Sequence, residues 1–420
     1  MSSSIKLAAN TGSSVVVEQC QVCGEKDLKP LLFLGYMPPV NQMPPIDRTP
    51  CEQPAYPALL LQCPKCSLVQ IGLIVDPNIL FPPEYPYTSG TTRILRENFA
   101  DLYTECSSFI DLSPESLCID IGSNDGTLLS NFQNGGHRVH GIEPTDMAKL
   151  ARERGIDTTI AFFSKETAVA VRKEQGPAAI VTATNVFAHI ENIHDIVEGI
   201  LELLDDRGTF ISESHYLMSL IETLQYDTVY HEHLRHYSLT SLGYLLNMHD
   251  LEIIHATRIP THGGSIRVYA ARPGVHKVRE TVGEILDQEK DSGASGLKNF
   301  RRRVVQSKLD LYALLSDIKA KGQRIYGIGA PSRASTLINY VGIDDGIMDC
   351  VLEVPGSYKI GKYMPGTLIP VEDETRLYKD PPEYALLLSW HIADELIPKL
   401  REKGFAGKFI VPLPEPRIVD

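Results

Sequence analysis

One pattern occurs twice in this chain and constrains its fold more than any other: an apolar strand, a glycine-rich turn and an amphipathic helix. In "ESLCIDIGSNDGTLLSNF" the apolar run 117–121 breaks at Gly122, and a helical pattern follows Gly126. In "RIYGIGAPSRASTLINYVG" the same order surrounds Gly327 and Gly329. Such units build doubly wound parallel sheets, which bind ligands at the carboxyl ends of their strands. The sequence therefore predicts an α/β protein with two Rossmann-like domains.

Ahead of both units, two C-x-x-C pairs predict a metal site. "CQVC" supplies Cys20 and Cys23, and "CPKC" supplies Cys63 and Cys66. Two such knuckles direct four thiolates at one tetrahedral ion, as in zinc ribbons. Unrelated buried thiols and a redox pair are the alternatives, but two matching knuckles favour zinc. Four thiolates leave no open position for water or substrate, so we expect a structural zinc in an N-terminal domain of residues 15–75.

The residues around the first turn indicate its cofactor. A dinucleotide fold favours G-x-G-x-x-G, whereas this turn reads G-x-x-x-G with two aspartates close by. Carboxylates repel a phosphate and attract a sulfonium, and an acidic residue ending the next strand can accept hydrogen bonds from ribose hydroxyls. The turn therefore predicts S-adenosylmethionine, with an NAD-dependent enzyme as the alternative. The predicted cofactor-binding residues are Asp120, Gly122, Asn124, Asp125, Gly126, Glu143 and Asn185.

Further strands follow the first unit in an order typical of class I methyltransferases. "AAIVTATNVFAHI" and "GTFISES" continue the parallel sheet, and "LEIIHATRI" and "GSIRVYAAR" predict a final hairpin. We assign residues 76–273 to this central domain.

Residues 274–420 form the predicted third domain. A long charged helical segment comes first, and "GASG" is expected to divide it into two helices. The backbone of the second glycine turn would present amide donors at a helix start, which suits an anion, and Arg333 adds a fork matched to phosphate. The alternative is a purely structural domain. The turn lacks the Gly-Lys-Ser/Thr of an ATPase loop, so nucleotide hydrolysis is not expected.

Charge and hydropathy exclude some partners. The net charge of −13 and the absence of a basic stripe disfavour nucleic acid as the main partner. No apolar run approaches the roughly 18 residues of a membrane span, and the N-terminus lacks a signal-peptide pattern. We expect a cytoplasmic monomer that acts on a small molecule.

The stretch "VYHEHLRHYS", residues 229–238, concentrates side chains suited to catalysis. It holds three histidines, two tyrosines and Glu232 within ten residues. Histidine is the side chain whose unperturbed pKa suits proton transfer near neutral pH. A solvated polar loop is the alternative.

Together these motifs resemble the S-adenosylmethionine-dependent sugar C-methyltransferases of the tetronitrose type, which have novobiocin-type relatives. The motifs come in the family's order from the first knuckle onward: "LGYMPPVNQM", "YPYTSG", "IDIGSNDGTLL", "NVFAHI", "YHEHLRHYS", "HGGSIRVY", "GIGAPSRASTLINY", "GKYMPGTLIPV" and "FIVPLPEPR". The resemblance implies a zinc domain, a methyltransferase domain and a Rossmann-like domain that helps to hold a nucleotide-linked 4-keto-deoxysugar, with dTDP as the expected nucleotide.

The resemblance also implies roles for individual residues. His233 would remove the proton next to the ketone, and Glu232 would orient His233 or bind the sugar. Tyr230 and His189 would donate to the ketone oxygen or other sugar groups, and either Tyr85 or Tyr87 would reach the active site. His231 and His236 are expected to be bystanders. The predicted contacts to the nucleotide sugar are His262, Arg267, Gly329, Ser332, Arg333, Lys362 and Tyr363.

The implied reaction is C-methylation through an enolate. Its rivals are O-methylation of a sugar hydroxyl, which needs no acidic C–H, and a zinc-ribbon nucleic-acid methyltransferase or binding module, which the charge disfavours.

Overall fold

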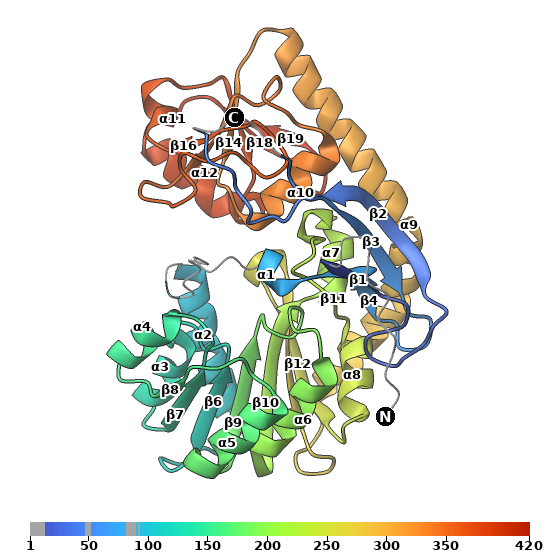
Figure 1. Cartoon of the computed structure of the whole chain (residues 1–420), viewed down its shortest axis with the longest axis vertical. Coiled ribbons are helices and arrows are strands. Elements are labelled where there is room, and N and C mark those ends of the chain that lie inside the picture. The colour runs from blue at the N-terminus through green and yellow to red at the C-terminus, as the bar shows by residue number, and fades with distance from the viewer. Residues whose placement is uncertain (1–12, 47–51, 81–89, 91–92) are drawn as a thin grey trace.

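The computed structural model describes residues 13–46, 52–80, 90 and 93–420. Figure 1 shows a small N-terminal sheet, a central α/β domain and a C-terminal α/β domain, with one long helix, α9, running along one side of the molecule. A single apolar cluster includes residues from all three parts, among them Leu60, Val181 and Leu337. The three parts therefore share packed surfaces.

The N-terminal sheet takes one of its strands from far along the chain. It has the antiparallel order β11-β4-β3-β2, and β11 lies within the histidine-rich stretch 229–238. A separate pair, β1 with β5, and the short helix α1 complete this part. The bounds are β1 Ser14–Val16, β2 Lys29–Met37, β3 Tyr56–Gln62, β4 Val69–Ile71, β5 Leu73–Val75, α1 Pro77–Leu80 and β11 Arg235–His236.

The central domain has the predicted sheet. Its seven strands run in the order β12-β13-β10-β9-β6-β7-β8, with five parallel strands and an antiparallel hairpin at one edge. The strands are β6 Leu117–Ile121, β7 Arg138–Ile142, β8 Thr158–Thr159, β9 Ala178–Thr184, β10 Leu204–His215, β12 Glu252–Ile259 and β13 Ser265–Ala271. The helices are α2 Arg93–Ser107, α3 Thr127–Asn134, α4 Met147–Glu153, α5 Lys165–Gln175, α6 Ile193–Leu203, α7 Leu217–Glu222 and α8 Leu239–Asn247.

The C-terminal sheet repeats this plan with six strands in the order β16-β15-β14-β17-β18-β19, of which only β19 is antiparallel to its neighbour. The strands are β14 Ile325–Ile328, β15 Cys350–Glu353, β16 Val371–Asp373, β17 Tyr384–Leu387, β18 Lys408–Val411 and β19 Arg417–Val419. The helices are α10 Ser332–Val341, α11 Arg376–Lys379 and α12 Ala393–Glu402. Both predicted strand–turn–helix units are therefore confirmed.

Helix α9, Glu280–Ala320, corrects one prediction. We expected "GASG" to divide this segment into two helices, but it forms one helix of 41 residues. A glycine in a helix costs only about 1 kcal/mol relative to alanine, which packing can offset. Gly296 contributes to that packing, because a Cβ atom there would lie 3.0 Å from Ile221 Cγ2 on α7.

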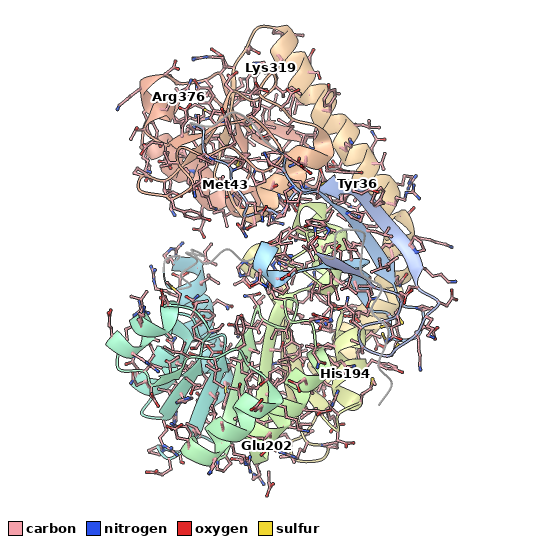
Figure 2. The ribbon with its side chains drawn as sticks, in the orientation of Figure 1. Tyr36, Met43, His194, Glu202, Lys319 and Arg376 are labelled. Atoms are coloured by element: carbon pink, nitrogen blue, oxygen red, sulfur yellow. The ribbon has the colours of Figure 1, made fainter. Side chains whose placement is uncertain are left out.

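The N-terminal part also contacts the C-terminal domain directly. Tyr363 N–H donates to Pro44 O at 2.7 Å, and Ile46 N–H donates to Gly361 O at 3.0 Å. Figure 2 labels Met43, which precedes this contact and lies at the lower side of the C-terminal domain.

Candidate active site

The four cysteines of the two knuckles lie together. Their sulfurs are within 4.8 Å of one another, with Cys20–Cys66 and Cys23–Cys63 both at 3.4 Å. Tetrahedral zinc with Zn–S bonds of about 2.3 Å would separate the sulfurs by roughly 3.8 Å. Cys23 N–H faces Cys20 Sγ, and Cys66 N–H faces Cys63 Sγ, each at 3.5 Å, which stabilises thiolates. A hydrogen bond from Cys66 lowers the pKa of Cys20 below its usual value. These residues fit a structural zinc ion.

The first glycine turn is built around a left-handed glycine and a buried carboxylate. Gly122 has a φ of 71°, and a Cβ atom there would lie 2.8 Å from Val186 Cγ2, so glycine is required. Its N–H donates to Ile142 O at 2.8 Å, and Asn124 N–H donates to Glu143 Oε2 at 3.0 Å. The end of β7 is thereby joined to the turn.

Buried polar atoms around this turn fit a polar cofactor. Glu143 Oε1 accepts from Thr145 N–H at 2.9 Å, but each carboxylate oxygen has further acceptor capacity. Among the described residues, Ser123 Oγ and Asn185 Oδ1 are buried without a hydrogen-bond partner. They follow the carboxyl ends of β6 and β9, where the doubly wound fold binds its ligands. These groups suit the ribose and amino-acid parts of S-adenosylmethionine.

The two aspartates near the turn serve protein groups. Asp120 accepts from the Thr182 hydroxyl at 2.6 Å, and burial raises its pKa to about 7. Asp125 accepts from Thr127 N–H at 3.2 Å and pairs with Arg154 at 3.1 Å. The predicted attraction for a sulfonium therefore rests less on these two residues than the sequence suggested.

His233 has a defined tautomer in the centre of the molecule. Its Nδ1 lies 2.7 Å from Thr228 O, and a carbonyl only accepts, so Nδ1 carries the proton and the neutral ring has its lone pair at Nε2. Burial holds the pKa of His233 well below its usual range, and His189 lowers it further. The rings of Tyr230, His189 and His215 lie 4.2, 5.0 and 5.1 Å away between centroids. The ring is therefore a neutral proton acceptor among other aromatic side chains.

His189 and His262 belong to the same cluster. His189 Nδ1 lies 2.8 Å from Glu232 O, so its neutral ring also has a lone pair at Nε2 and accepts there, where we predicted a donor. Burial lowers the pKa of His189 and keeps the ring neutral. His262 Nε2 lies 3.3 Å from Asn185 Nδ2, and its ring stacks on His215 at 5.5 Å. Four of the predicted site residues, His189, His233, His262 and Asn185, thus lie together near the carboxyl ends of β9 and β10.

Glu232 connects all three parts of the molecule. Its Oε1 accepts from Asn41 Nδ2 at 2.6 Å, and Asn41 Oδ1 accepts from the Ser332 hydroxyl at 3.2 Å. Burial raises the pKa of Glu232 to about 7, while Asn41 and Lys359 oppose that rise. Thr228 holds His233 Nδ1, so Glu232 does not orient that nitrogen. Of the two roles considered for Glu232, sugar binding agrees better with this geometry.

Arg333 is engaged inside the protein, where we predicted a phosphate ligand. Its Nε and Nη2 lie 3.0 Å from the two carboxylate oxygens of Asp227, and Nη2 also donates to Gln225 Oε1 at 3.0 Å. Trp390 Nε1 donates to the same carboxylate at 2.7 Å. The pair is buried and joins α10 to the loop that precedes His233.

The second glycine turn has a different cation beside it. Gly329 has a φ of 81°, and Ala330 N–H donates to Glu353 Oε2 at 3.0 Å. Lys359 Nζ donates to Ala330 O at 2.6 Å, and burial lowers the pKa of this lysine. Lys362 lies over the Tyr358 ring at 4.8 Å. The positive charge that contacts this turn therefore comes from Lys359.

Three predicted site residues lie elsewhere or outside the described residues. Arg267 is buried within the central sheet, where Nε donates to Glu213 and Nη1 donates to Glu105, each at 2.6 Å, so we do not carry it into the substrate site. Tyr85 and Tyr87 lie outside the described residues. Gly90, just beyond them, donates its N–H to Asp125 Oδ2 at 3.2 Å.

Sequence reasoning missed several residues of this region. Asn41 lies in the motif "LGYMPPVNQM" but has no charge to single it out, and Asp227 precedes the histidine-rich stretch. His215 ends β10 at a carboxyl end, which is a usable signal for a site residue. The other missed residues are Gln225, Arg235 and Lys359.

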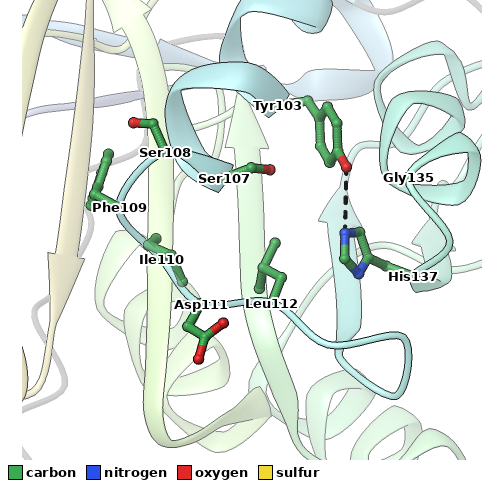
Figure 3. A pocket seen from close by; sticks show the side chains of 9 residues that line it. All are labelled: Tyr103, Ser107, Ser108, Phe109, Ile110, Asp111, Leu112, Gly135 and His137. Carbon is green, nitrogen blue, oxygen red and sulfur yellow. Dashed lines mark hydrogen bonds between the residues drawn. The ribbon is translucent and has the colours of Figure 1, made fainter.

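A surface pocket of about 500 Å³ lies between the end of α2 and the turn after α3, next to His137 just before β7. Figure 3 shows Tyr103 and His137 facing each other there, with Oη and Nε2 3.5 Å apart. None of the predicted site residues lines it.

Comparisons with known proteins bear on this site. Family models match three consecutive segments: a zinc binding domain over residues 20–81, a methyltransferase domain over 92–256 and a C-methyltransferase C-terminal domain over 260–414. The C-methyltransferase NovU of Streptomyces niveus is 31% identical over 411 residues, which cover 96% of this chain and 97% of that protein. This chain belongs to the S-adenosylmethionine-dependent C-methyltransferase family. The resemblance read from the sequence is confirmed.

Solved structures add little to the description of this C-methyltransferase. Magnesium protoporphyrin IX methyltransferase ChlM of Synechocystis PCC 6803, solved with bound S-adenosylmethionine, is 14% identical with a TM-score of 0.33, covering 42% of this chain and 79% of that one. The CcbJ methyltransferase of Streptomyces caelestis is 13% identical with a TM-score of 0.34, covering 45% and 93%. TM-scores this low carry no argument.

Among the described residues, no helix has both the length and the apolar surface to cross a membrane.

Proposed function

We propose that this C-methyltransferase methylates the carbon next to the ketone of a nucleotide-linked 4-keto-deoxysugar, with a dTDP-sugar as the expected form. The observation that carries the proposal is the fixed tautomer of His233, whose Nδ1–H is held by Thr228 O at 2.7 Å. A C-methylation of this kind begins with loss of a proton from carbon. A neutral imidazole with its lone pair at Nε2 is suited to accept that proton.

Burial has a defined effect on this base. Because it lowers the pKa of His233, the ring is neutral and ready to accept at neutral pH. Loss of the proton leaves an enolate, whose oxygen needs a donor. We assign that donor role to the hydroxyl of Tyr230, whose ring lies 4.2 Å from that of His233. His189 would accept a hydrogen bond from a sugar hydroxyl.

The cofactor and the nucleotide sugar are assigned to different turns. Bound S-adenosylmethionine supplies an electrophilic methyl group, and its ribose would be held by Glu143. We assign the nucleotide sugar to the C-terminal domain, residues 274–420, with Gly329, Ser332, Lys362 and Tyr363 as contacts. Asn41 joins Glu232 to Ser332 beside the second turn, and Glu232 and Asn41 would bind the sugar ring there.

Two measurements test the reaction. The first is mass spectrometry of the products formed from S-adenosylmethionine and a panel of dTDP-4-keto sugars. The second is exchange of the substrate's C–H proton with solvent deuterium in the presence of S-adenosylhomocysteine. We expect the wild type to exchange and His233→Asn to lose exchange while it retains S-adenosylhomocysteine binding.

His231→Asn is the matched control, because His231 lies in the same stretch but faces Pro57 O of the N-terminal sheet at 3.2 Å. It should exchange as the wild type does. A methylated product formed without C–H exchange at any substrate carbon would indicate O-methylation and overturn the proposal. Exchange that persists in His233→Asn would remove the base assignment alone.

A further inference from the structure

Strand β11 joins the active-site stretch to the zinc-bearing sheet. Arg235 pairs with Gln70 and His236 pairs with Val69 in an antiparallel ladder, and Ile71 N–H donates to Leu234 O at 3.0 Å. Figure 1 shows β11 beside β4. His233 lies two residues before this strand, and the second knuckle lies just before β4. The ladder therefore fixes the distance between the knuckle and the predicted base.

The first knuckle is attached to the same strand pair through Gln70. This side chain is fully buried and contacts the backbone on both sides of Cys20. Its Oε1 accepts from Gln21 N–H at 2.9 Å, and its Nε2 donates to Gln19 O at 3.3 Å. Gln70 is the ladder partner of Arg235. The first knuckle, through Gln70, and the second knuckle, through β4, are therefore both connected to β11 at Arg235.

Arg235 in turn holds the loop that carries His189. Its guanidinium donates to Phe187 O at 3.2 Å, to Ile190 O at 2.6 Å and to Glu191 O at 2.5 Å. Leu234 N–H adds a bond to Ala188 O at 2.8 Å. Carbonyls on both sides of His189 are thus fixed from one stretch of β11.

The charge of Arg235 requires an explanation. The side chain is 1% exposed, and within the described residues no salt bridge joins it to a carboxylate. A buried cation is costly unless a negative charge compensates it. Four thiolates and one Zn²⁺ have a net charge of −2, and burying this negative charge without a compensating cation is also costly. Burial lowers the pKa of Arg235, and its neighbour Tyr237 opposes that shift. Gln70 is the ladder partner of Arg235 and bonds to the backbone on both sides of Cys20, so the cation lies on the strand next to the residue that holds the first knuckle.

We propose that Arg235 is a positioning residue that balances the charge of the zinc–thiolate centre and holds the backbone around His189, so that the zinc centre sets the geometry of the active-site loops. The zinc therefore supports more than the N-terminal domain. The roles of His189 and His233 rest on the proposed function, whereas the link between zinc and these loops does not.

Two substitutions separate the charge of Arg235 from its shape. Arg235→Gln removes the charge, and Arg235→Lys keeps the charge but loses the planar fork that holds several carbonyls. Arg172→Gln is the matched control, because Arg172 also donates to three carbonyls, those of residues 202–204, on the outside of the central domain. Each zinc-loaded enzyme is mixed with a chromophoric chelator, and the rate of zinc release is recorded.

We expect Arg235→Gln to release zinc about tenfold to a hundredfold faster than the wild type, as is typical when a group that supports metal ligands is lost. Arg235→Lys should release zinc at nearly the wild-type rate but have a lower kcat, with unchanged binding of S-adenosylhomocysteine. This division between zinc retention and kcat is not expected of a merely structural residue. Arg172→Gln should match the wild type in every measurement.

Hydrogen–deuterium exchange gives a readout that needs no substrate. In the zinc-loaded Arg235 variants the amides of residues 187–191 and 229–236 should exchange faster, whereas those of β6 and β7 should not. Wild-type zinc release in Arg235→Gln, or unchanged exchange in both segments, would overturn the proposal. If Arg235→Gln does not fold, the test rests on Arg235→Lys. A lower kcat with faster amide exchange in the two segments would support the proposal, and wild-type values of both would overturn it. Absence of sugar methylation in the wild type, with zinc release and amide exchange of the variants as expected, would instead count against the proposed function alone.

Discussion

The two glycine turns have the same pattern of backbone hydrogen bonds but different side chains around them. In the first, Gly122 N–H donates to Ile142 O and Glu143 accepts from the turn; in the second, Gly329 N–H donates to Leu352 O and Glu353 accepts from the turn. The two strand-to-turn hydrogen bonds are both 2.8 Å long. The same device thus occurs in both α/β domains.

The difference lies in the origin of the neighbouring side chains. Around the first turn, the contacts of Glu143 and Asp125 remain within residues 76–273, the predicted central domain. Around the second turn, Ser332 contacts Asn41, and Arg333 contacts Asp227. The first turn can therefore bind its ligand independently, whereas the second is connected to the stretch that holds the predicted base.

The largest expected effect concerns the two carboxylates. Glu143→Ala should weaken S-adenosylhomocysteine binding on the order of a thousandfold, because each of two hydrogen bonds to a charged acceptor contributes roughly 1.5–3 kcal/mol. Glu353→Ala should leave this binding unchanged and raise the KM for the sugar substrate. Isothermal titration with S-adenosylhomocysteine measures cofactor affinity in both variants, and steady-state kinetics measures the KM. Equal loss of cofactor affinity in the two would contradict it.

The next effect compares two arginine–aspartate pairs. Arg333→Met should lower the free energy of unfolding by about 3–5 kcal/mol, because it leaves the buried Asp227 without its cation. Arg154→Met should cost about 1 kcal/mol, because that arginine is 46% exposed in its pair with Asp125. Urea unfolding measures both. Adding Asp227→Asn to Arg333→Met should recover part of the loss, and a stable single variant would show that the pair is dispensable.

A third effect depends on pH. The folded pKa of Glu232, about 7, lies above its ordinary value of 4.5, so its protonated form is favoured in the folded state. This contribution is fully present below pH 4.5 and is lost as the pH rises through about 7, which amounts to about 2 kcal/mol between pH 5 and pH 7. Glu232→Gln should remove this part of the slope in urea unfolding at the two values. An unchanged slope would place the pKa near its ordinary range.

The smallest effect tests the connection through Asn41. Asn41→Ala removes the hydrogen bonds to Glu232 and Ser332. Because the bond to Glu232, the proposed sugar ligand, contributes about 1 kcal/mol, we expect kcat/KM to fall by roughly fivefold to tenfold. S-adenosylhomocysteine binding should not change. If it does change, the two turns are less independent than their contacts indicate.

The sequence predicted what depends on local pattern. Both strand–turn–helix units, the final hairpin of the central sheet and the clustering of four cysteines agree with the structure. These features follow from residues close in the chain, such as Gly122 and its neighbours, or from knuckles whose spacing is itself the signal. Glycines at 293 and 296 misled the prediction for α9, because helix packing outweighed their local preference.

Partners far apart in the chain were not predictable. Arg333 looked like a phosphate ligand because the residue that engages it, Asp227, lies on another domain. The same holds for Asn41 with Glu232, and for Arg235 with the carbonyls around His189. A single sequence shows which side chains can pair but not which of them meet.

Strand β11 has a consequence for the synthesis of this protein. The knuckles are complete at Cys66 and β4 ends at Ile71, but the strand that covers the edge of β4 begins only at Arg235. On the ribosome, this edge stays open while the intervening chain is translated, and open edges can pair with other chains. Early capture of zinc would order the knuckles during that interval. The sheet beneath the predicted base is thus begun near the start of translation and closed only after half of the chain has emerged.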